Sequence, residues 1–296
     1  MTTDAQTAIR LVGDRLGMPD GAAGHSVATS AGESTVLHVD WPGGREVVLK
    51  LYRDDAGATA FETQRRLAAS VGPDDRPLAI PDALFYDAGM RILVQRAAPG
   101  ASLRAAIASG RHDAMAMAGR AAARLHALPG TELPEPSTAE HVAQLMRPHP
   151  LALAEAAPAL RPRIEAVLDA VHRAAAAAGS HRATVHRDLH PGQMLVDDAR
   201  MWLIDWDLAA AGDPALDVGN LLAWLETHLQ DRDARACRDR FLAGYVDGGG
   251  ENALGRTDAY RAFTYLRLAC KRFRFGRDIA TEVAPLIDGA EAALAA

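Results

Sequence analysis

Short runs of apolar and β-branched residues, separated by turn residues, fill the first hundred positions of the chain. The runs Ser34–Asp40 and Glu46–Tyr52 flank the turn sequence Trp-Pro-Gly-Gly and predict a β-hairpin. The runs Asp82–Tyr86 and Arg91–Arg96 predict a second strand pair. Between them, Ala56–Val71 has apolar residues at helical spacing among charged ones, so we predict a helix there.

The pattern changes at Ala97-Ala-Pro-Gly-Ala101, where proline and glycine interrupt the chain and helical periodicity takes over. We therefore predict an N-terminal domain, residues 1–98, with a small antiparallel sheet, and a larger helical domain, residues 99–296. The fold class is α+β. The predicted helices, besides the one already named, cover residues 3–16, 103–108, 114–128, 138–178 with proline breaks, 214–229, 231–246, 257–275 and 279–294.

The overall composition fits a folded protein and argues against a nucleic-acid partner. Of the 296 residues 49% are hydrophobic and 24% are charged, and the net charge is −6. Nucleic-acid binders usually have a basic balance. The run 271–277 is basic and aromatic, but at helical spacing we expect its aromatic rings to pack inward and its arginines to face water.

The sequence favours a cytoplasmic protein without a membrane partner. The N-terminus lacks the basic region and the apolar core of a signal peptide, and no apolar stretch is long enough to span a bilayer. The two cysteines, Cys237 and Cys270, have neither metal-ligand spacing nor the pattern of a disulfide framework. A reducing compartment is therefore expected.

Oxygen-bearing side chains cluster around a second predicted hairpin, formed by residues 194–196 and 201–204. Asp188 and Gln193 precede this hairpin, and Asp205 follows it. Because a tight hairpin brings its two ends together, we expect these three side chains to converge. Two carboxylates and an amide oxygen suit Mg²⁺, which prefers oxygen ligands and binds together with substrate phosphates.

A different chemistry is open to the same segment. His186, Asp188 and His190 alternate, so on a strand they would share one face. Such a cluster is typical of zinc or iron ligands and would indicate a metal-dependent hydrolase. Pro191 and Gly192 favour a loop instead, and the sequence has no further histidine-rich motif to complete the ligand set.

Three segments together resemble the aminoglycoside phosphotransferase and choline kinase-like family, which shares the protein-kinase fold. They are His186-Arg-Asp-Leu-His-Pro-Gly-Gln193, Leu-Ile-Asp-Trp-Asp207 and Gly212-Asp-Pro-Ala-Leu-Asp217. Their order and spacing agree with the family pattern over about 35 residues. The resemblance implies a two-lobed protein-kinase-like enzyme that uses ATP and Mg²⁺ to phosphorylate a hydroxyl group of a small molecule.

The resemblance also implies roles for single residues. Asp188 would be the catalytic base or would orient the acceptor hydroxyl, and Asp205 would ligate Mg²⁺. Gln193 stands where the family commonly has asparagine, and it offers the same ligand atom on a longer stem. Asp213 and Asp217 would be structural, capping the helix that follows and bracing the catalytic loop.

In the N-terminal domain the resemblance requires a lysine that contacts phosphate. Only two of the 32 basic residues are lysines, and Lys50 lies within the apolar run Val-Val-Leu-Lys-Leu. A chain that almost always uses arginine has reason to place a compact charge there. The expected partner of Lys50 is Glu62, the acidic residue of the helix at 56–71.

Two further stretches are expected to contact the nucleotide. The small polar segment 29–35 precedes a strand and would cover the phosphates, with Ser34 among the contacts, although it lacks a G-x-G-x-x-G pattern. Gln95 and Ala97 fall where the family holds adenine with its hinge backbone.

The acceptor is expected to be an aminoglycoside-like antibiotic, an amino alcohol or a sugar, bound in the helical domain. We expect this site near Trp206 and Asp207 and the helices after residue 214, where Glu226, Asp231 and Asp233 are candidate contacts for a cationic group. A catalytically weak nucleotide-binding protein remains an alternative. A protein kinase is disfavoured, because no Asp-Phe-Gly or Ala-Pro-Glu segment is present.

Overall fold

The computed structural model describes residues 5–18, 24–29, 34–72, 75–130, 132–179 and 182–296. The chain forms two compact units. Unit 1 comprises residues 1–101 and 195–208, and unit 2 comprises residues 102–194 and 209–296. The predicted boundary at residue 98 lies close to the first crossing, but the segment 195–208, which we had placed in the second domain, belongs to unit 1.

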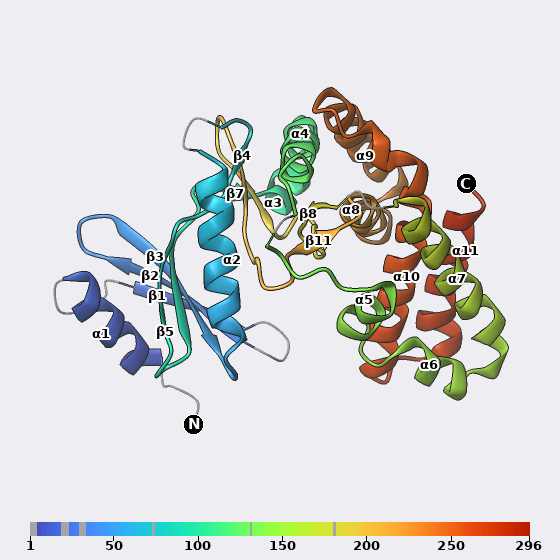
Figure 1. The fold of residues 1–296 in the computed structure, drawn as a ribbon, viewed down its shortest axis with the longest axis horizontal. Helices are drawn as coiled ribbons and strands as arrows, with labels where there is room; N and C mark the ends of the chain where they lie inside the picture. Colours follow the sequence, from blue (N-terminus) through green and yellow to red (C-terminus); the bar gives the residue numbers. More distant parts are fainter. Residues whose placement is uncertain (1–4, 19–23, 30–33, 73–74, 131, 180–181) are drawn as a thin grey trace. The chain divides into compact units, whose positions relative to one another are not determined.

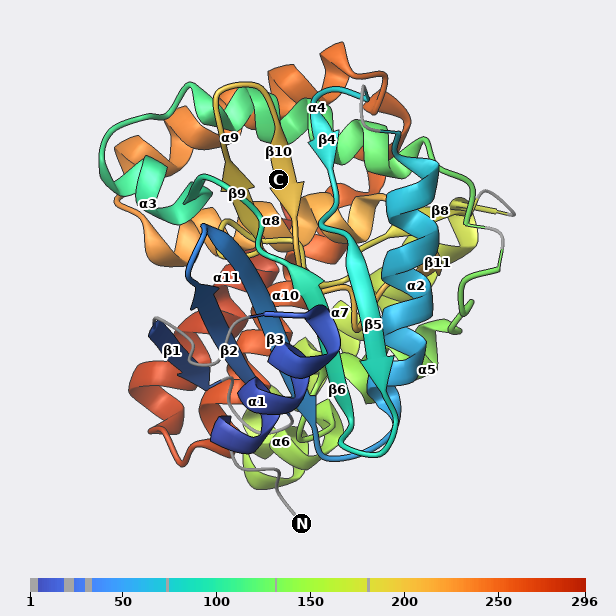
Figure 2. The ribbon, with the colours of Figure 1, turned by 90° about the vertical axis from the view of Figure 1, so that its left-hand side faces the viewer.

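Unit 1 is built on a five-stranded antiparallel sheet with the strand order β1-β2-β3-β6-β5 (Figure 2). The strands are β1 (Gly24–Thr29), β2 (Ser34–Trp41), β3 (Arg45–Tyr52), β5 (Ala83–Asp87) and β6 (Ile92–Arg96). Both predicted strand pairs are confirmed, and Val36 lies opposite Lys50 in the first of them. Strand β1 was not predicted, because its sequence, Gly-His-Ser-Val-Ala-Thr, has no run of apolar residues.

Two helices, α1 (Ala5–Leu16) and α2 (Ala56–Ser70), cover opposite faces of this sheet (Figure 1). Helix α1 buries Ile9 and Val12 against a core that includes Leu49 and Leu51 of β3. Because successive side chains of a strand point to opposite faces, Lys50 is directed to the other face, which is the face of α2.

The second predicted hairpin is confirmed as β9 (Met194–Val196) and β10 (Met201–Leu203). Asp197 stabilises its turn, since its carboxylate accepts hydrogen bonds from the backbone N–H of Ala199 and Arg200, at 2.8 and 2.7 Å. Strand β10 pairs in parallel with β4 (Leu78–Ala79), which ties the hairpin to unit 1. This pairing explains why the hairpin belongs to the first unit and not to the second.

Unit 2 is mainly helical. Its elements are α3 (Leu103–Ala108), α4 (Ala114–His126), α5 (Thr138–Leu145), α6 (Pro150–Ala156), η1 (Pro158–Leu160), α7 (Arg161–Ala177), β8 (Ala183–Val185), β11 (Ala210–Gly212), α8 (Ala215–His228), α9 (Asp231–Asp247), η2 (Glu251–Arg256), α10 (Thr257–Arg274), η3 (Ile279–Val283) and α11 (Ala284–Leu294). A short strand β7 (Ala101–Ser102) lies at the boundary of the units. The predicted helical content is confirmed. The antiparallel pair of β8 and β11 was not predicted, because three-residue strands leave no periodic pattern.

Two local predictions were wrong in detail. Asp213 does not have the N-cap position of α8, which Pro214 occupies, although its carboxylate accepts a hydrogen bond from Ala215 at 3.1 Å. Within the run 271–277, Phe275 is 55% exposed rather than packed inward, because α10 ends at Arg274 and the ring lies beyond its last turn.

None of the helices in the described ranges combines the length and the apolar character that crossing a bilayer requires.

Candidate active site

In unit 1 the side chain of Lys50 lies between two carboxylates. Its Nζ atom is 2.6 Å from Asp205 Oδ1 and 2.7 Å from Asp207 Oδ2. The Tyr52 hydroxyl donates a hydrogen bond to the other oxygen of Asp207 at 2.8 Å. Strand β3 places Lys50 and Tyr52 two positions apart on one face, and the chain leaving β10 brings in both aspartates. Asp207 and Tyr52 were not predicted as partners of the lysine.

The charges of this cluster shift the pKa values of Lys50 and Asp207. Burial alone would lower the pKa of the Lys50 ammonium, but the carboxylates of Asp205 and Asp207 outweigh this effect and raise it. Burial raises the pKa of the Asp207 carboxyl, and the nearby Asp205 charge raises it further, against the lowering effect of Lys50. Two carboxylates share one ammonium, so the cluster carries a net negative charge that suits a further cation.

Asp205 has a backbone conformation that few side chains adopt. Its φ angle is +69°, in the left-handed region, and in unit 2 Arg187 has a φ angle of +67°. Non-glycine residues in this region are uncommon and cost about 1–3 kcal/mol when the structure holds them there. Arg187 directly precedes Asp188, and Asp205 is itself a candidate functional residue.

The predicted pair of Lys50 with Glu62 does not form among the residues that the structure describes. Glu62 is paired instead with Arg65, one turn along α2, at 2.8 Å, and its side chain is 47% exposed. The buried positions of α2 include Ala60 and Gln64. Glu62 is two residues from each of them, about 200° around a helix with 3.6 residues per turn, and so it faces away from the sheet.

The other nucleotide contacts predicted in unit 1 lie at two ends of the sheet. Ser34 begins β2 directly opposite Tyr52, so it is near the lysine cluster. Gln95 is buried in β6, opposite Val48. The backbone N–H of Ala97 donates to the carbonyl of Glu46 at 3.2 Å. Of the predicted phosphate-covering segment, residues 30–33 lie outside the described residues.

In unit 2 the loop from His186 to Gln193, which carries Asp188, is held by helix α8. The buried Asp217 accepts hydrogen bonds from the backbone N–H groups of His186 and Arg187, both at 2.7 Å. The predicted bracing role of Asp217 is therefore what its contacts show. Asn220, one turn further along α8, donates to the carbonyl of Leu189 at 2.8 Å. The loop is thus fixed on both sides of Asp188.

A second layer of hydrogen bonds orients Asp217 itself. His126 of α4 contacts the Asp217 carboxylate at 3.1 Å through Nε2, and its Nδ1 atom contacts the Tyr245 hydroxyl of α9 at 2.7 Å. Burial would raise the pKa of the Asp217 carboxyl, but the hydrogen bond and charge of His126 and the loop N–H groups lower it. Sequence reasoning did not identify His126 or Tyr245, because each is a single residue within an ordinary helix.

The Asp188 carboxylate faces a cation. Arg267 of α10 lies 3.0 Å from its Oδ1 atom, and Asp188 is 26% exposed. The His190 ring is on the other side, with Nε2 at 3.9 Å from Oδ2. Arg267 was missed by the sequence analysis, since α10 carries many arginines and nothing in their spacing distinguishes this one.

Asp188 and Asp205 belong to different units, so their predicted convergence, and that of Gln193 with them, stays a prediction. Gln193 is half-buried and its backbone N–H donates to the carbonyl of His190 at 2.9 Å. Within the described ranges no group of three histidine, cysteine or acidic side chains is placed to hold a metal ion. The hydrolase alternative, which rests on His186, Asp188 and His190, therefore lacks a ligand set.

The predicted acceptor residues have other contacts. Trp206 is only 2% exposed and donates to the carbonyl of Leu203, so it cannot line an open site. Glu226 accepts a hydrogen bond from the Tyr265 hydroxyl at 2.9 Å and lies 3.6 Å from Arg261. Asp231, at the start of α9, has an exposed side chain.

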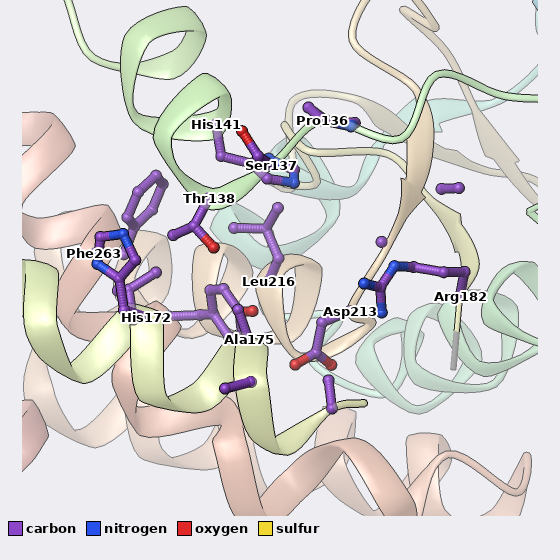
Figure 3. Close-up of a pocket in the computed structure, with 16 residues that line it drawn as sticks. Pro136, Ser137, Thr138, His141, His172, Ala175, Arg182, Asp213, Leu216 and Phe263 are labelled. Carbon is purple, nitrogen blue, oxygen red and sulfur yellow. The ribbon is translucent and has the colours of Figure 1, made fainter. Parts of the chain in front are cut away.

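Unit 2 also contains a cavity of about 370 Å³ between α5, α7, α8 and α10 (Figure 3). Figure 3 shows His172 and Phe263 at one end and Asp213 and Arg182 at the other. Asp188 does not line it. The Asp213 carboxylate is held by Arg256, with contacts at 2.7 and 2.9 Å, so this charge is already compensated.

Comparison with known proteins identifies the family and the fold of the chain. A profile of the phosphotransferase enzyme family (APH) matches residues 27–260. No curated protein matches the sequence significantly.

Solved structures share the fold over nearly the whole chain. A macrolide 2′-phosphotransferase from Brachybacterium faecium is 23% identical, with a TM-score of 0.60 and 97% of each chain covered. A choline/ethanolamine kinase family protein from Mesorhizobium loti is 18% identical, with a TM-score of 0.68, covering 98% of this chain and 95% of that chain. An aminoglycoside phosphotransferase in ternary complex with AMP-PNP and hygromycin B is also 18% identical, with a TM-score of 0.71 and 98% of each chain covered.

These matches confirm the resemblance predicted from residues 186–217 and the two-lobed α+β fold. Because the family profile covers most of the sequence, the chain belongs to the phosphotransferase enzyme family.

Proposed function

We propose that this phosphotransferase transfers the γ-phosphoryl group of Mg²⁺-bound ATP to a hydroxyl group of a small molecule. The observation that carries the proposal is the position of Lys50, whose ammonium lies within 2.7 Å of Asp205 and Asp207. The similar fold of an aminoglycoside phosphotransferase in complex with AMP-PNP and hygromycin B supports both the nucleotide and the hydroxyl acceptor.

The donor atoms of the cluster fit the proposed metal. Mg²⁺ binds to one or two carboxylates and completes its shell with water and phosphate oxygens. Asp205 and Asp207 offer such carboxylates, 37% and 31% exposed, and they exceed the single ammonium charge beside them. In this proposal Asp205 holds Mg²⁺, and the amide oxygen of Gln193 is a further candidate ligand.

The reaction requires little covalent chemistry from the protein itself. Bound MgATP supplies the phosphoryl group, as the bond from the γ-phosphorus to the β–γ bridging oxygen breaks, a bond to the acceptor oxygen forms, and ADP leaves. Lys50 binds phosphate oxygens, with Ser34 at the same end of the sheet as a further candidate contact. Asp188 orients the acceptor hydroxyl and takes its proton. The adenine contacts proposed for Gln95 and Ala97 belong to the same scheme, whereas Glu62 faces away from Lys50 and is not part of it.

The experiment that tests this function separates binding from turnover. Asp188→Asn removes the proton acceptor while keeping the size of the side chain. We expect it to lower phosphoryl transfer by about 10²- to 10⁴-fold, the usual contribution of a general base, and to leave the affinity for Mg-AMP-PNP within about threefold. Asp198→Asn, the same change at an exposed position of the β9–β10 turn, is the control and should leave both unchanged.

Activity is measured as ATP consumption and product formation against aminoglycosides, other antibiotics, amino alcohols and sugars. Full turnover in Asp188→Asn would refute the assigned role. Nucleotide binding by the wild-type protein without consumption in the presence of any acceptor would favour the alternative of a catalytically weak nucleotide-binding protein.

A further inference from the structure

Three aromatic rings form a row next to Asp188 in unit 2. The His190 and Trp224 rings are stacked with 6.4 Å between their centroids, and the Trp224 and His228 rings are stacked at 4.5 Å. His190 is also the neighbour of the Asp188 carboxylate, at 3.9 Å. The row therefore extends from the candidate catalytic group along α8, beside the place where a hydroxyl group that reaches Asp188 would bind.

Positive charges surround this row. Arg104 lies beside the catalytic loop, since its backbone N–H donates to the carbonyl of Pro191 at 3.1 Å. Burial is the main reason why the pKa of the His228 imidazole is lowered, against a hydrogen bond to a backbone carbonyl that raises it. The charges of Arg104, Arg272 and Lys271 lower this pKa further. Lys271 lies one turn along α10 from Arg267, which contacts Asp188 at 3.0 Å.

Few acidic groups compensate these cations. Arg272 is 3.6 Å from Glu282. In the described part of the chain, Arg104 and Lys271 have no carboxylate within 4.0 Å, and both are exposed. Lys271 is the second of the two lysines of the chain.

The acids near the row are engaged in ion pairs or lie at the start of α9. Glu226 of α8 is paired with Arg261 and Tyr265. Asp231 and Asp233 lie in the first turn of α9, where the helix dipole favours negative charge. The surface around the row is thus electropositive, although the whole chain carries a net charge of −6.

We propose that the acceptor of this enzyme is an anionic alcohol, a hydroxyl compound that carries a carboxylate or phosphate group bound near Arg104 and Lys271. This inference rests on the proposed function and specifies its substrate class. A polycationic amino sugar would meet like charges at this surface, and like charges at close range disfavour a partner strongly.

A choline-like cation is the main competitor, because tryptophan faces can bind quaternary ammonium groups. Trp224 does not offer such a cage. One of its faces is stacked on His228 at 4.5 Å, and the charges with the largest effect on that imidazole are the same cations. A positive ligand would therefore gain little from the ring and would be repelled by its surroundings.

The test compares alcohols that differ only in charge. The probes are 4-(hydroxymethyl)benzoate, 4-methylbenzyl alcohol and 4-(aminomethyl)benzyl alcohol, which share a flat benzyl alcohol skeleton and are anionic, neutral and cationic. We measure kcat/KM for each at saturating MgATP, and the affinity of each by calorimetry with Mg-AMP-PNP bound. We expect the anionic probe to exceed the cationic one by about tenfold or more in low salt, a preference that added salt reduces.

Charge reversals locate the effect. Lys271→Glu and Arg104→Glu should each reduce the preference by about tenfold or reverse it. Arg173→Glu makes the same charge change on the exposed surface of α7, away from this site, and should leave the preference unchanged. Thermal melting shows that each variant is folded.

The outcomes separate this inference from the function on which it rests. A preference for the cationic probe, equal values for all three probes in both turnover and binding, or a preference that Arg173→Glu changes as much as Lys271→Glu would overturn the inference. Those results leave the proposed phosphotransfer intact. Failure of the protein to bind Mg-AMP-PNP would instead contradict the proposed function.

Discussion

Lys50 shows why the choice of a single side chain matters in this chain. Its ammonium is a compact charge that approaches Asp205 and Asp207 from one point, at 2.6 and 2.7 Å. An arginine has a planar fork of five donors and would bind one carboxylate in a bidentate manner instead of bridging two. The rare use of lysine in this sequence, which pointed to Lys50, thus has a geometric reason.

His141 of α5 is a second single residue with a testable effect, in this case on the pH dependence of stability. Its Nδ1 atom is buried without a hydrogen-bond partner. The pKa of this imidazole is lowered to about 4, chiefly by burial and then by the Arg187 charge, against the opposite effects of Asp217 and Glu140. The folded state therefore holds His141 neutral in a range where the unfolded chain binds a proton.

This shift predicts a loss of stability in acid. Above the ordinary histidine pKa of about 6.5 both states are neutral, and His141 contributes nothing to the pH dependence. As the pH falls from 6.5 towards 4, only the unfolded state takes up a proton, so the free energy of unfolding decreases by about 2–3 kcal/mol. Below pH 4 the effect levels off.

The measurement is urea unfolding at several pH values for the wild type and two variants. His141→Leu should remove this part of the pH dependence, whereas His172→Leu, at an exposed position on the same cavity, should keep it. Parallel pH profiles for the wild type and His141→Leu would show that the assignment is wrong.

At the residue scale, motif spacing pointed to candidate functional residues but not to their partners. Asp188 and Asp205 follow from a dense pattern of polar residues in a short segment, and the loop bracing by Asp217 follows from the same resemblance. Asp207 as a partner of Lys50, and Arg267 as a partner of Asp188, depend on which strand or helix lies alongside. The sequence carries no signal for such long-range neighbours.

At the scale of elements, helix faces decide which predicted contacts are possible. Helix α2 was predicted correctly, but its sheet-facing side is formed by positions such as Ala60 and Gln64, so Glu62 points away. Helix α8 is buried over most of its length, and its inward positions Asp217 and Asn220 hold the loop that carries Asp188. A polar residue on a buried helix face thus fixes a neighbouring loop, whereas an acidic residue on an open face does not.

Helices α4 and α9 approach each other closely enough to require glycine. A Cβ atom at Gly119 would meet the carbonyl oxygen of Phe241 and would lie 2.6 Å from the backbone nitrogen of Tyr245. Backbone atoms of a packed helix cannot move aside as a flexible side chain can. The same interface positions Tyr245 for its contact with His126.

Gly119→Ala should therefore destabilise the protein despite the better helix propensity of alanine. We expect the free energy of unfolding to fall by about 3 kcal/mol, at the upper end of the range for overpacking. Gly255→Ala is the control, because a Cβ atom there has no neighbour within 4 Å, and it should stay within about 0.5 kcal/mol of the wild type. Urea unfolding compares the two, and equal effects would contradict the steric argument.

At the scale of the whole molecule, the chain passes from unit 1 to unit 2, returns to unit 1 and then enters unit 2 again. Unit 1 is discontinuous, because residues 195–208 return to it after the chain has entered unit 2. This segment supplies β10 and both carboxylates around Lys50. The chain before and after this segment is joined in unit 2, where β8 pairs with β11 and Val185 lies opposite Ala210. Sequence periodicity placed the boundary near residue 98 but could not reveal this return, which depends on a two-residue strand pairing.

The order of unfolding follows from this connectivity. If unit 2 unfolds, the β8–β11 pairing opens, and closing the loop that returns β10 to unit 1 then costs entropy. We expect the same event to separate Lys50 from its carboxylates. We therefore expect unit 1 to lose its structure at the same urea concentration as unit 2 or at a lower one, but not at a higher one.

Natural probes distinguish the two units. Cys237 and Cys270 both belong to unit 2 and are fully buried, and burial raises the pKa of their thiols to about 11 and about 12, so native thiols should not react with a disulfide reagent. In a Trp224→Phe variant the remaining tryptophans, at positions 41, 202 and 206, all lie in unit 1. Fluorescence of this variant then follows unit 1, and thiol reactivity follows unit 2.

Single variants Cys237→Ala and Cys270→Ala assign the reactive thiol and show whether α9 and α10 open together. The expected result is one urea midpoint for both thiols, with the tryptophan midpoint at the same concentration or below it. A tryptophan midpoint clearly above the thiol midpoint would mean that unit 1 keeps its structure without the β8–β11 pairing. In that case the segment 195–208 would have to stay bound to unit 1 by its own contacts, chiefly the β4–β10 pairing and the two carboxylates on Lys50. The inference that unit 1 depends on a folded unit 2 would then be wrong.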